Sequence, residues 1–208
     1  MKDHFGLYLI LTDPVAGYAA CAKAAVDCNV RYLQLRMKNK PRADVLETAR
    51  AIRAITRGTS TRFIVNDDLA VAMKVDADGL HLGQSDQPLP EARKAWNTPG
   101  KIMGLSTHSA GQAMQALESE PDYIGVGPVF STPTKNNADP ALGVERTGQI
   151  MQDSPLTAVA IGGIESGNLP NLLKAGIENF CVVRAVNDVE DPAAAIRILQ
   201  KIWKDHRF

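Results

Sequence analysis

Short apolar runs alternate with amphipathic stretches along the whole of this 208-residue chain. The apolar runs have the length of strands, and several, such as Ile124-Gly125-Val126, show no polar side, which indicates strands that are buried on both faces. Strands of this kind that alternate with helices are typical of βαβ units in a parallel sheet. We predict eight strands: Leu7–Thr12, Tyr32–Arg36, Arg62–Asn66, Gly79–Gly83, Lys101–Ser106, Tyr123–Val126, Ala158–Ile161 and Asn179–Val183.

The stretches between the strands have helical spacing of their apolar positions. The predicted helices are Tyr18–Asn29, Arg42–Arg57, Asp68–Lys74, Leu89–Ala95, Ala110–Glu118, Glu145–Gln152, Asn168–Ala175 and Pro192–Lys204. A doubly wound open sheet would also alternate strands and helices. Eight repeats with polar residues after most strands favour closure, so we predict an α/β fold with a single (β/α)8 TIM-barrel domain over residues 1–208.

Composition narrows the classes of partner. The chain has 23 basic and 23 acidic residues and no basic stripe, so no nucleic acid partner is expected. No apolar run has the length that a membrane span needs, and the start of the chain lacks the apolar core of a signal peptide. Three cysteines without metal-type spacing are expected to pack as apolar residues in a reducing cytoplasm. Whether the chain forms a homo-oligomer stays open.

Polar side chains follow the second predicted strand. Gln34, Arg36 and Lys38 alternate along an extended segment, so their side chains point to one face. An amide and two cations on one face suit an anion such as phosphate, because Arg forks across two oxygens and Lys adds a compact charge. The alternative is a solvated strand end, which the neighbouring Asn66 and Asp67 make less favourable.

Two carboxylates follow the next two strands. Asp67 ends the third strand and Asp86 comes shortly after the fourth, so both are expected at the same edge of the barrel. Two carboxylates beside the Asn66 amide suit Mg2+, which completes its shell with water and phosphate oxygens. The alternative is that Asp67 or Asp68, and also Asp86, cap the helices that follow. We favour the cap for Asp68 and the metal role for Asp67 and Asp86.

The later strands are followed by further polar or glycine-rich segments. Thr132, Pro133, Thr134 and Lys135 lie in the long segment Pro128–Gly143 and form either a phosphate-binding loop or an ordinary turn. Gly162-Gly163 after the seventh strand allows backbone N–H groups to approach an anion, although a tight turn without a ligand is the alternative. Arg184 adds a cation after the eighth strand, and Ser106 adds a hydroxyl at the end of the fifth.

The histidines give no clear catalytic group. His81 falls within a strand and is expected in the core or at its rim, and His108 lies near the mouth without an evident acidic partner.

Taken together, these segments resemble thiamine phosphate synthase from Leu7 to about Leu199. The resemblance rests on seven motifs in register: Gln34-Leu-Arg-Met-Lys38, Phe63-Ile-Val-Asn-Asp67, Gly79-Leu-His-Leu-Gly-Gln-Ser-Asp86, Gly104-Leu-Ser106, Gly125-Val-Gly-Pro-Val-Phe130, Thr132-Pro-Thr-Lys135 and Ala160-Ile-Gly-Gly-Ile164. It implies a transferase that joins 4-amino-5-hydroxymethyl-2-methylpyrimidine diphosphate to a thiazole phosphate, by a dissociative mechanism.

The resemblance also implies roles for individual residues. Asp67 and Asp86 would carry Mg2+, and Arg36, Lys38 and Lys135 would stabilise the departing diphosphate. The predicted substrate-binding set is Gln34, Leu35, Arg36, Met37, Lys38, Asn66, Ser106 and Lys135 for the pyrimidine diphosphate, and Thr132, Pro133, Thr134, Gly163, Val183 and Arg184 for the thiazole phosphate.

One residue departs from the family pattern, and two other functions compete. Position 184 is often a small hydroxyl residue in the family and is Arg here, so Arg184 either binds the thiazole phosphate or turns outward toward Asp188 or Glu190. A related thiazole tautomerase shares the barrel but handles no diphosphate. A non-catalytic phosphate-ligand sensor is expected to lack the carboxylate pair or Lys135, and this chain has all three residues.

Overall fold

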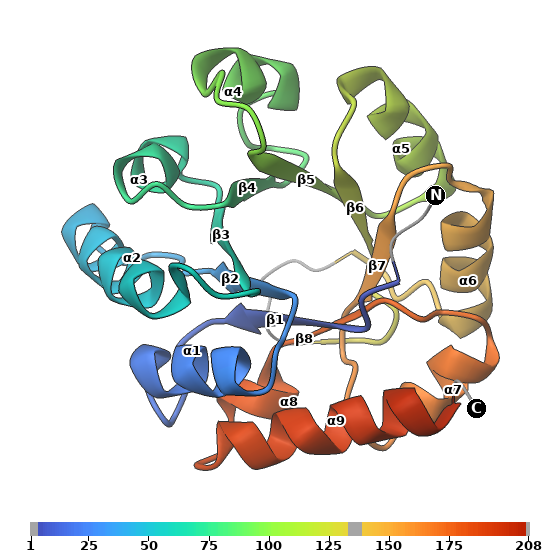
Figure 1. The fold of residues 1–208 in the computed structure, drawn as a ribbon. Helices are drawn as coiled ribbons and strands as arrows, with labels where there is room; N and C mark the ends of the chain where they lie inside the picture. Colours follow the sequence, from blue (N-terminus) through green and yellow to red (C-terminus); the bar gives the residue numbers. More distant parts are fainter. Residues whose placement is uncertain (1–3, 133–138, 207–208) are drawn as a thin grey trace.

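Eight parallel strands close into a barrel in the computed structural model, which describes residues 4–132 and 139–206. Each strand pairs with its neighbour in sequence, and the first pairs with the last through Leu7–Phe180, Tyr8–Cys181 and Leu9–Val182 (Figure 1). The prediction of a closed barrel is therefore confirmed and the open sheet is excluded. The strands are β1 (Leu7–Leu11), β2 (Tyr32–Leu35), β3 (Arg62–Asn66), β4 (Gly79–Leu82), β5 (Ile102–Thr107), β6 (Tyr123–Val126), β7 (Ala158–Ile161) and β8 (Phe180–Val182).

Helices surround the barrel and cover the outer face of its strands, as Figure 1 shows. The predicted helices are present with small shifts at their ends, and the fifth ends in a 3-10 turn, η1 (Ala116–Ser119). The helices are α1 (Tyr18–Asp27), α2 (Arg42–Thr56), α3 (Leu69–Lys74), α4 (Leu89–Ala95), α5 (Ala110–Gln115), α6 (Val144–Asp153), α7 (Leu169–Lys174), α8 (Arg184–Asn187) and α9 (Pro192–His206).

The short helix α8 was not predicted. The sequence pattern continues the last strand to Val183, but β8 ends at Val182 and the chain turns at once into α8. One turn of helix is too short for a periodic pattern to reveal it. As a consequence, Arg184 begins a helix at the edge of the barrel and does not extend a strand.

Alternation along the strands divides the apolar side chains into two main layers. Leu9, Leu33 and Leu80 belong to the core between barrel and helices, together with helix residues such as Ile52 and Ile196. The other strand positions point into the barrel, where they form a smaller apolar cluster whose buried members are Tyr8, Ile10, Ile64, Tyr123, Val159 and Cys181. Because the barrel interior is filled by side chains, polar side chains that point into the barrel reach solvent only at its two ends.

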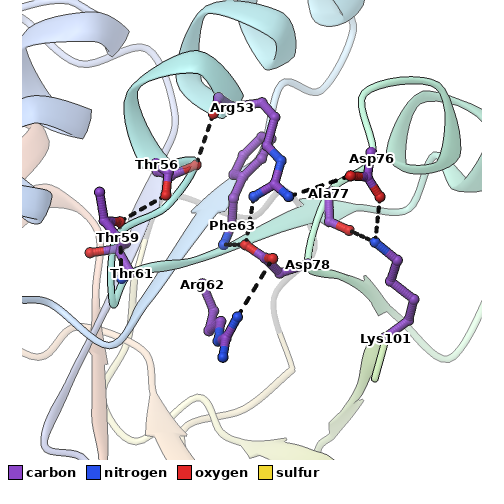
Figure 2. Close-up of polar contacts among 10 residues, drawn as sticks. All are labelled: Arg53, Thr56, Thr59, Thr61, Arg62, Phe63, Asp76, Ala77, Asp78 and Lys101. Atoms are coloured by element: carbon purple, nitrogen blue, oxygen red, sulfur yellow. Dashed lines mark hydrogen bonds and ion pairs between the residues drawn. The ribbon is translucent and has the colours of Figure 1, made fainter. Parts of the chain in front are cut away.

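The end of the barrel where the strands begin is held by Asp78, which directly precedes β4 (Figure 2). Its Oδ2 accepts hydrogen bonds from the Phe63 N–H at 2.8 Å and from Arg53 Nη1 at 3.0 Å. The second Arg53 nitrogen lies 3.6 Å from Asp76, whose other oxygen accepts a 2.7 Å hydrogen bond from Lys101. One carboxylate thus ties α2 to the start of two strands.

Two other strands begin in a similar way. Asp122 before β6 accepts from the Met103 N–H at 2.7 Å and from Arg93 at 3.1 Å. Asn179 before β8 accepts from the N–H groups of Phe5 and Gly6. In each case an oxygen satisfies a backbone donor of the neighbouring strand at the point where the sheet ladder ends. The charged residues around Asp78, at the end of the barrel where the strands begin, are called the lower network below; they are Arg53, Asp76, Asp78 and Lys101.

The remaining general predictions concern cysteines and membranes. All three cysteines are free thiols; Cys21 and Cys181 are buried and Cys28 is half-buried, in agreement with a packing role. Among the described residues, no helix combines the length and the apolar character that crossing a membrane requires.

Candidate active site

A cavity of about 570 Å3 opens at the end of the barrel where the strands finish, and residues at or after all eight strands line it. This is the end at which barrel enzymes assemble their active sites. Residues from every predicted group come together there. The predicted site residues that line the cavity are Gln34, Arg36, Lys38, Asn66, Asp67, Asp86, Ser106, Thr132, Gly163, Val183 and Arg184.

The alternating residues Gln34, Arg36 and Lys38, at the end of β2 and just after it, point into the cavity, as the sequence indicated. Gln34 is buried, Arg36 is half-buried and Lys38 is exposed, so the three side chains rise from the floor to the rim. Leu35 and Met37 face the other way and pack in the core against the helices. Any contact between these two residues and a ligand would have to involve their backbone.

The two carboxylates Asp67 and Asp86 meet at the rim. The two side chains lie close enough for each carboxyl group to affect the pKa of the other, and Lys38 forms an ion pair with Asp67. Burial, and then the hydrogen bond with Asp86, raise the pKa of Asp67, and Lys38 opposes this rise. For Asp86, burial also acts upward, but hydrogen bonds from Asp67 and from the Gly83 N–H outweigh it, so the pKa lies below its usual value. The two partly buried carboxylates therefore differ in pKa: Asp86 loses its proton more readily than Asp67, which is the one that pairs with Lys38.

Neither of these carboxylates is a helix cap. Asp68 is the N-cap of α3, where its Oδ1 accepts from the Val71 N–H at 2.9 Å and from Arg42 at 2.7 Å. Pro88 occupies the cap position of α4 and makes no side-chain cap bond, while Asp86 accepts from Gly83 at 2.7 Å within the preceding turn. The preference for Asp68 as the cap is confirmed.

The backbone at Asp67 is unusual. Its φ is positive, at 62°, which is uncommon for a residue other than glycine.

The opposite side of the cavity is formed by the turns after β7 and β8. Gly162 and Gly163 both have positive φ, and a Cβ at Gly163 would lie 2.8 Å from Cβ of Phe130. The glycines therefore let this turn pack closely against the segment after β6. Arg184 is exposed and lines the cavity. Within the described part of the chain it forms no ion pair, so the outward pairing with Asp188 or Glu190, which was the alternative to phosphate binding, is absent there.

The floor of the cavity rests on a chain of hydrogen bonds that crosses the barrel interior. Gln34 Nε2 donates to Tyr8 Oη at 2.9 Å, and Tyr8 Oη lies 2.8 Å from Tyr123 Oη. Tyr123 Oη lies 2.9 Å from His81 Nδ1, and His81 Nε2 lies 2.9 Å from Ser106 Oγ. Burial lowers the pKa of His81 to about 4 and raises the pKa of both tyrosines, so all three side chains are neutral near pH 7.

Sequence reasoning did not identify the three internal members of this hydrogen-bond chain, Tyr8, Tyr123 and His81, as part of the site. His81 was expected in the core or at its rim, which is correct, but its two polar partners lie on other strands. The polar tips of Tyr8 and Tyr123 within otherwise apolar strands were the available signal, because a buried Tyr hydroxyl usually has a partner. His108 also has an acidic neighbour that was not foreseen: its Nδ1 lies 3.6 Å from Asp139 and 2.7 Å from the Gly127 carbonyl.

The predicted phosphate-binding loop lies only partly within the described residues. Thr132 lines the cavity, whereas Pro133, Thr134 and Lys135 lie outside the described residues. The described residues contain no cluster of three or more His, Cys, Asp or Glu side chains that would suit a metal ion.

Comparison with known proteins agrees with this geometry. The family model described as thiamine monophosphate synthase matches residues 7–186. The thiamine-phosphate synthase of Moorella thermoacetica is 38% identical over 199 residues, which cover 94% of each chain. That of Vibrio campbellii is 37% identical over 197 residues, which cover 94% of this chain and 96% of the relative.

The solved structures agree as well. The thiamine phosphate pyrophosphorylase from Pyrococcus furiosus superimposes with a TM-score of 0.87 at 32% identity, covering 98% of this chain and 97% of that one. A 3-hexulose-6-phosphate synthase, at 17% identity and a TM-score of 0.68, shares the fold alone. The match over nearly the whole length, together with a mouth built from the family's motifs, shows that this chain belongs to the thiamine monophosphate synthase family.

Proposed function

We propose that this chain is a transferase that joins 4-amino-5-hydroxymethyl-2-methylpyrimidine diphosphate to 4-methyl-5-(2-phosphooxyethyl)thiazole, giving thiamine phosphate and diphosphate. The observation that carries the proposal is the gathering of Arg36, Lys38, Asp67 and Asp86 on one side of a single cavity, with Gly163 and Arg184 also lining it. The cavity thus offers one charged region for a diphosphate and a second for a phosphate. A thiazole tautomerase, which handles no diphosphate, has no need of the first region.

The first region provides charge for the leaving group. Arg36 is half-buried and, in the described part of the chain, free of any carboxylate partner, so its guanidinium can fork across two diphosphate oxygens. Lys38 can leave its ion pair with Asp67 and bind the same diphosphate instead. Gln34, Asn66 and Ser106 add neutral hydrogen-bonding groups around it. Lys135 is proposed to join them from the loop.

The pair Asp67 and Asp86 fits a divalent cation. The two carboxylates lie side by side at the cavity rim, and the ion pair between Asp67 and Lys38 shows that this position attracts a positive charge. Mg2+ is commonly held by one or two carboxylates plus water and substrate phosphate, so a pair suffices. We therefore propose that Asp67 and Asp86 hold Mg2+, which when bound supplies positive charge to the phosphate oxygens.

The chemistry follows from where this charge lies. The bond between the pyrimidine methylene and the diphosphate oxygen breaks first, and Arg36 and Lys38 stabilise the negative charge that grows on the departing oxygen. The electron-rich aminopyrimidine ring stabilises the methylene cation, and the thiazole nitrogen then donates its lone pair to form the new C–N bond. No side-chain nucleophile is needed. The chain's residues bind both substrates in line and exclude competing water.

The second region is proposed to hold the thiazole phosphate. Thr132, Thr134, Gly163, Val183 and Arg184 are the residues assigned to it, and the turn at Gly163 brings backbone close to the cavity. Arg184 gives this region a full positive charge where a small hydroxyl residue would give only a neutral donor.

The direct test is incubation of the folded protein with both substrates and Mg2+, followed by mass-spectrometric detection of thiamine phosphate. Product that needs both substrates, disappears with a chelator and returns with Mg2+ is the expected result. Conversion of thiazole tautomers without any use of the diphosphate would favour the tautomerase instead. Absence of product from properly folded protein would overturn the proposal.

A further inference from the structure

Two groups assigned to the pyrimidine diphosphate lie at opposite ends of one internal hydrogen-bond chain. Gln34 on β2, His81 on β4 and Ser106 on β5 line the cavity, whereas Tyr8 and Tyr123 lie beneath it. The chain between Gln34 and Ser106 runs through Tyr8, Tyr123 and His81, with every separation between 2.8 and 2.9 Å. Three side chains that no part of the proposed reaction uses therefore connect two that it does use.

The protons in this chain can be ordered from the Gln34 end. Tyr8 Oη accepts from Gln34 Nε2, so the Tyr8 proton is free to donate to Tyr123 Oη. If Tyr123 donated to Tyr8 instead, the Tyr8 proton would be buried without an acceptor among these residues, which is costly. The Tyr123 proton therefore goes to His81 Nδ1.

The ordering then reaches Ser106. A neutral imidazole that accepts at Nδ1 carries its proton on Nε2, and this N–H donates to Ser106 Oγ. The Ser106 hydroxyl proton then has no acceptor within the hydrogen-bond chain and is free to point into the cavity. The backbone of Ser106 is held as well, because its carbonyl accepts a 2.6 Å hydrogen bond from Gln84.

The local sequence makes room for this arrangement. A Cβ on Gly104 would lie 2.2 Å from Cζ and 2.5 Å from Oη of Tyr123. Only glycine at this position therefore leaves room for the end of the Tyr123 side chain against β5. The Tyr123 ring stacks on His81 with centroids 5.5 Å apart and lies 5.7 Å from the Tyr8 ring. The hydroxyls are thus fixed by packing as well as by hydrogen bonds.

We propose that Tyr8, Tyr123 and His81 are positioning residues that hold Ser106 as a hydrogen-bond donor toward the pyrimidine diphosphate. The reverse proton order would make Ser106 donate to His81 and present only its lone pairs to an anion. This inference rests on the proposed function for the identity of the ligand, but the proton order itself is a property of the protein alone. The two can therefore be tested separately.

The proton order is tested by nitrogen NMR of wild-type protein without any substrate. We expect His81 to be neutral, with the proton on Nε2 and with Nδ1 as a hydrogen-bonded acceptor. In Tyr123→Phe the Nδ1 signal should shift, because its donor is gone. A proton on Nδ1 in the wild type would reverse the order and overturn the inference, whatever reaction the enzyme catalyses.

The action through Ser106 is tested by a double-mutant cycle on the calorimetric affinity for the pyrimidine diphosphate. Tyr123→Phe in the wild type should weaken binding by roughly 3- to 10-fold, the cost of an ordinary hydrogen bond, with thiazole phosphate affinity unchanged. In a Ser106→Ala background the same change should alter affinity by less than about twofold, because the group that it positions is already missing. Equal effects in the two backgrounds would overturn the proposal.

Tyr32→Phe is the matched control. The Tyr32 ring stacks against Tyr8 and Tyr123, with centroids 5.4 and 6.0 Å away, but its hydroxyl is not part of the chain. This variant should bind the pyrimidine diphosphate as the wild type does. If it weakened binding as much as Tyr123→Phe, general loosening of the aromatic cluster would explain the result and the positioning role would be excluded.

Discussion

The two ends of the barrel use the same residue types in opposite ways. At the end where the strands begin, Asp78 binds a backbone N–H and a buried Arg53, and Asp76 binds Lys101. At the mouth, the two carboxylates Asp67 and Asp86 lie together, and Arg36 and Arg184 form no ion pair with any described residue. Every charged group of the lower network faces an opposite charge, although Arg53 Nε is buried without a hydrogen-bond partner, whereas the mouth leaves charges of both signs that a ligand can satisfy.

This difference separates stability from function. Charges that the fold satisfies by itself stabilise the native state and contribute nothing to binding. Clustered like charges and unpaired cations cost some stability and are retained where a ligand or metal compensates them. We therefore predict that substitutions at the mouth change activity with little change in stability, and that substitutions in the lower network change stability with little change in activity.

The largest effect is expected at the carboxylate pair. Asp67→Asn and Asp86→Asn should each reduce kcat by at least about 100-fold, since the charge that they are proposed to bring to the diphosphate is worth several kcal/mol. The melting temperature should stay close to that of the wild type, because Asn tolerates the positive φ of position 67 and one of two clustered charges is removed. Steady-state kinetics and calorimetry check both statements; near-normal kcat in both variants would refute the metal role.

The lower network should show the opposite behaviour. Asp78→Asn keeps an oxygen for the Phe63 N–H but removes the charge that faces Arg53, whose side chain is only 13% exposed. We expect a loss of about 1.5–3 kcal/mol in the free energy of unfolding, the usual range for hydrogen bonds to charged groups. Urea denaturation measures it, and kcat of the folded fraction should be unchanged. A fall in kcat with normal stability would contradict the assignment of stability to the lower network and of function to the mouth.

Arg184 allows a finer test within the mouth. Arg184→Ser should weaken thiazole phosphate binding by roughly 10- to 100-fold, since a hydrogen bond to a charged group is worth about 1.5–3 kcal/mol. Affinity for the pyrimidine diphosphate should barely change, because the described residues assigned to it lie on or just after β2 to β5. Calorimetric titration of each substrate decides the matter. Equal thiazole phosphate affinities would leave Gly163 and the backbone at Val183 to bind that phosphate.

The smallest effect is expected at Asp76, whose side chain is 64% exposed. Its hydrogen bond with Lys101 lowers its pKa, so its contribution is present above the unfolded pKa of about 4 and is lost as pH falls below it. Because the pair is exposed on the Asp76 side, Asp76→Asn should cost less than about 1 kcal/mol at pH 7, and less still in high salt. Denaturation at two salt concentrations checks this, and a large salt-independent loss would be inconsistent with it.

Much of the fold could be predicted because each barrel unit has a strong local signal. Strands such as Ala158–Ile161 are apolar on both sides, and amphipathic stretches such as Leu89–Ala95 follow them, so period and length alone define them. Topology then places the ends of all eight strands together, which is why residues as distant as Gln34 and Arg184 could be assigned to one mouth. The helix α8 was missed since a single turn has no period.

What the sequence could not provide was pairing between side chains. Nothing local tells that His81 meets Tyr123 on one side and Ser106 on the other, because the three residues lie on different strands whose register is known only from the closed barrel. The same holds for the meeting of Asp67 with Asp86. The roles of Pro133, Thr134 and Lys135 stay predictions, since these residues lie outside the described structure.

One measurement tests the contrast between the two ends most directly: the melting temperature of wild type, Asp67→Asn and Asp78→Asn, each with and without inorganic diphosphate and Mg2+. A ligand at about 100 times its Kd adds roughly 2.7 kcal/mol, which corresponds to a rise of about 5–10 °C for a chain of this size. We predict that Asp67→Asn keeps the starting temperature and loses the rise, while Asp78→Asn starts lower and keeps the full rise. An equal rise in Asp67→Asn and the wild type, or a lost rise in Asp78→Asn, would contradict the account.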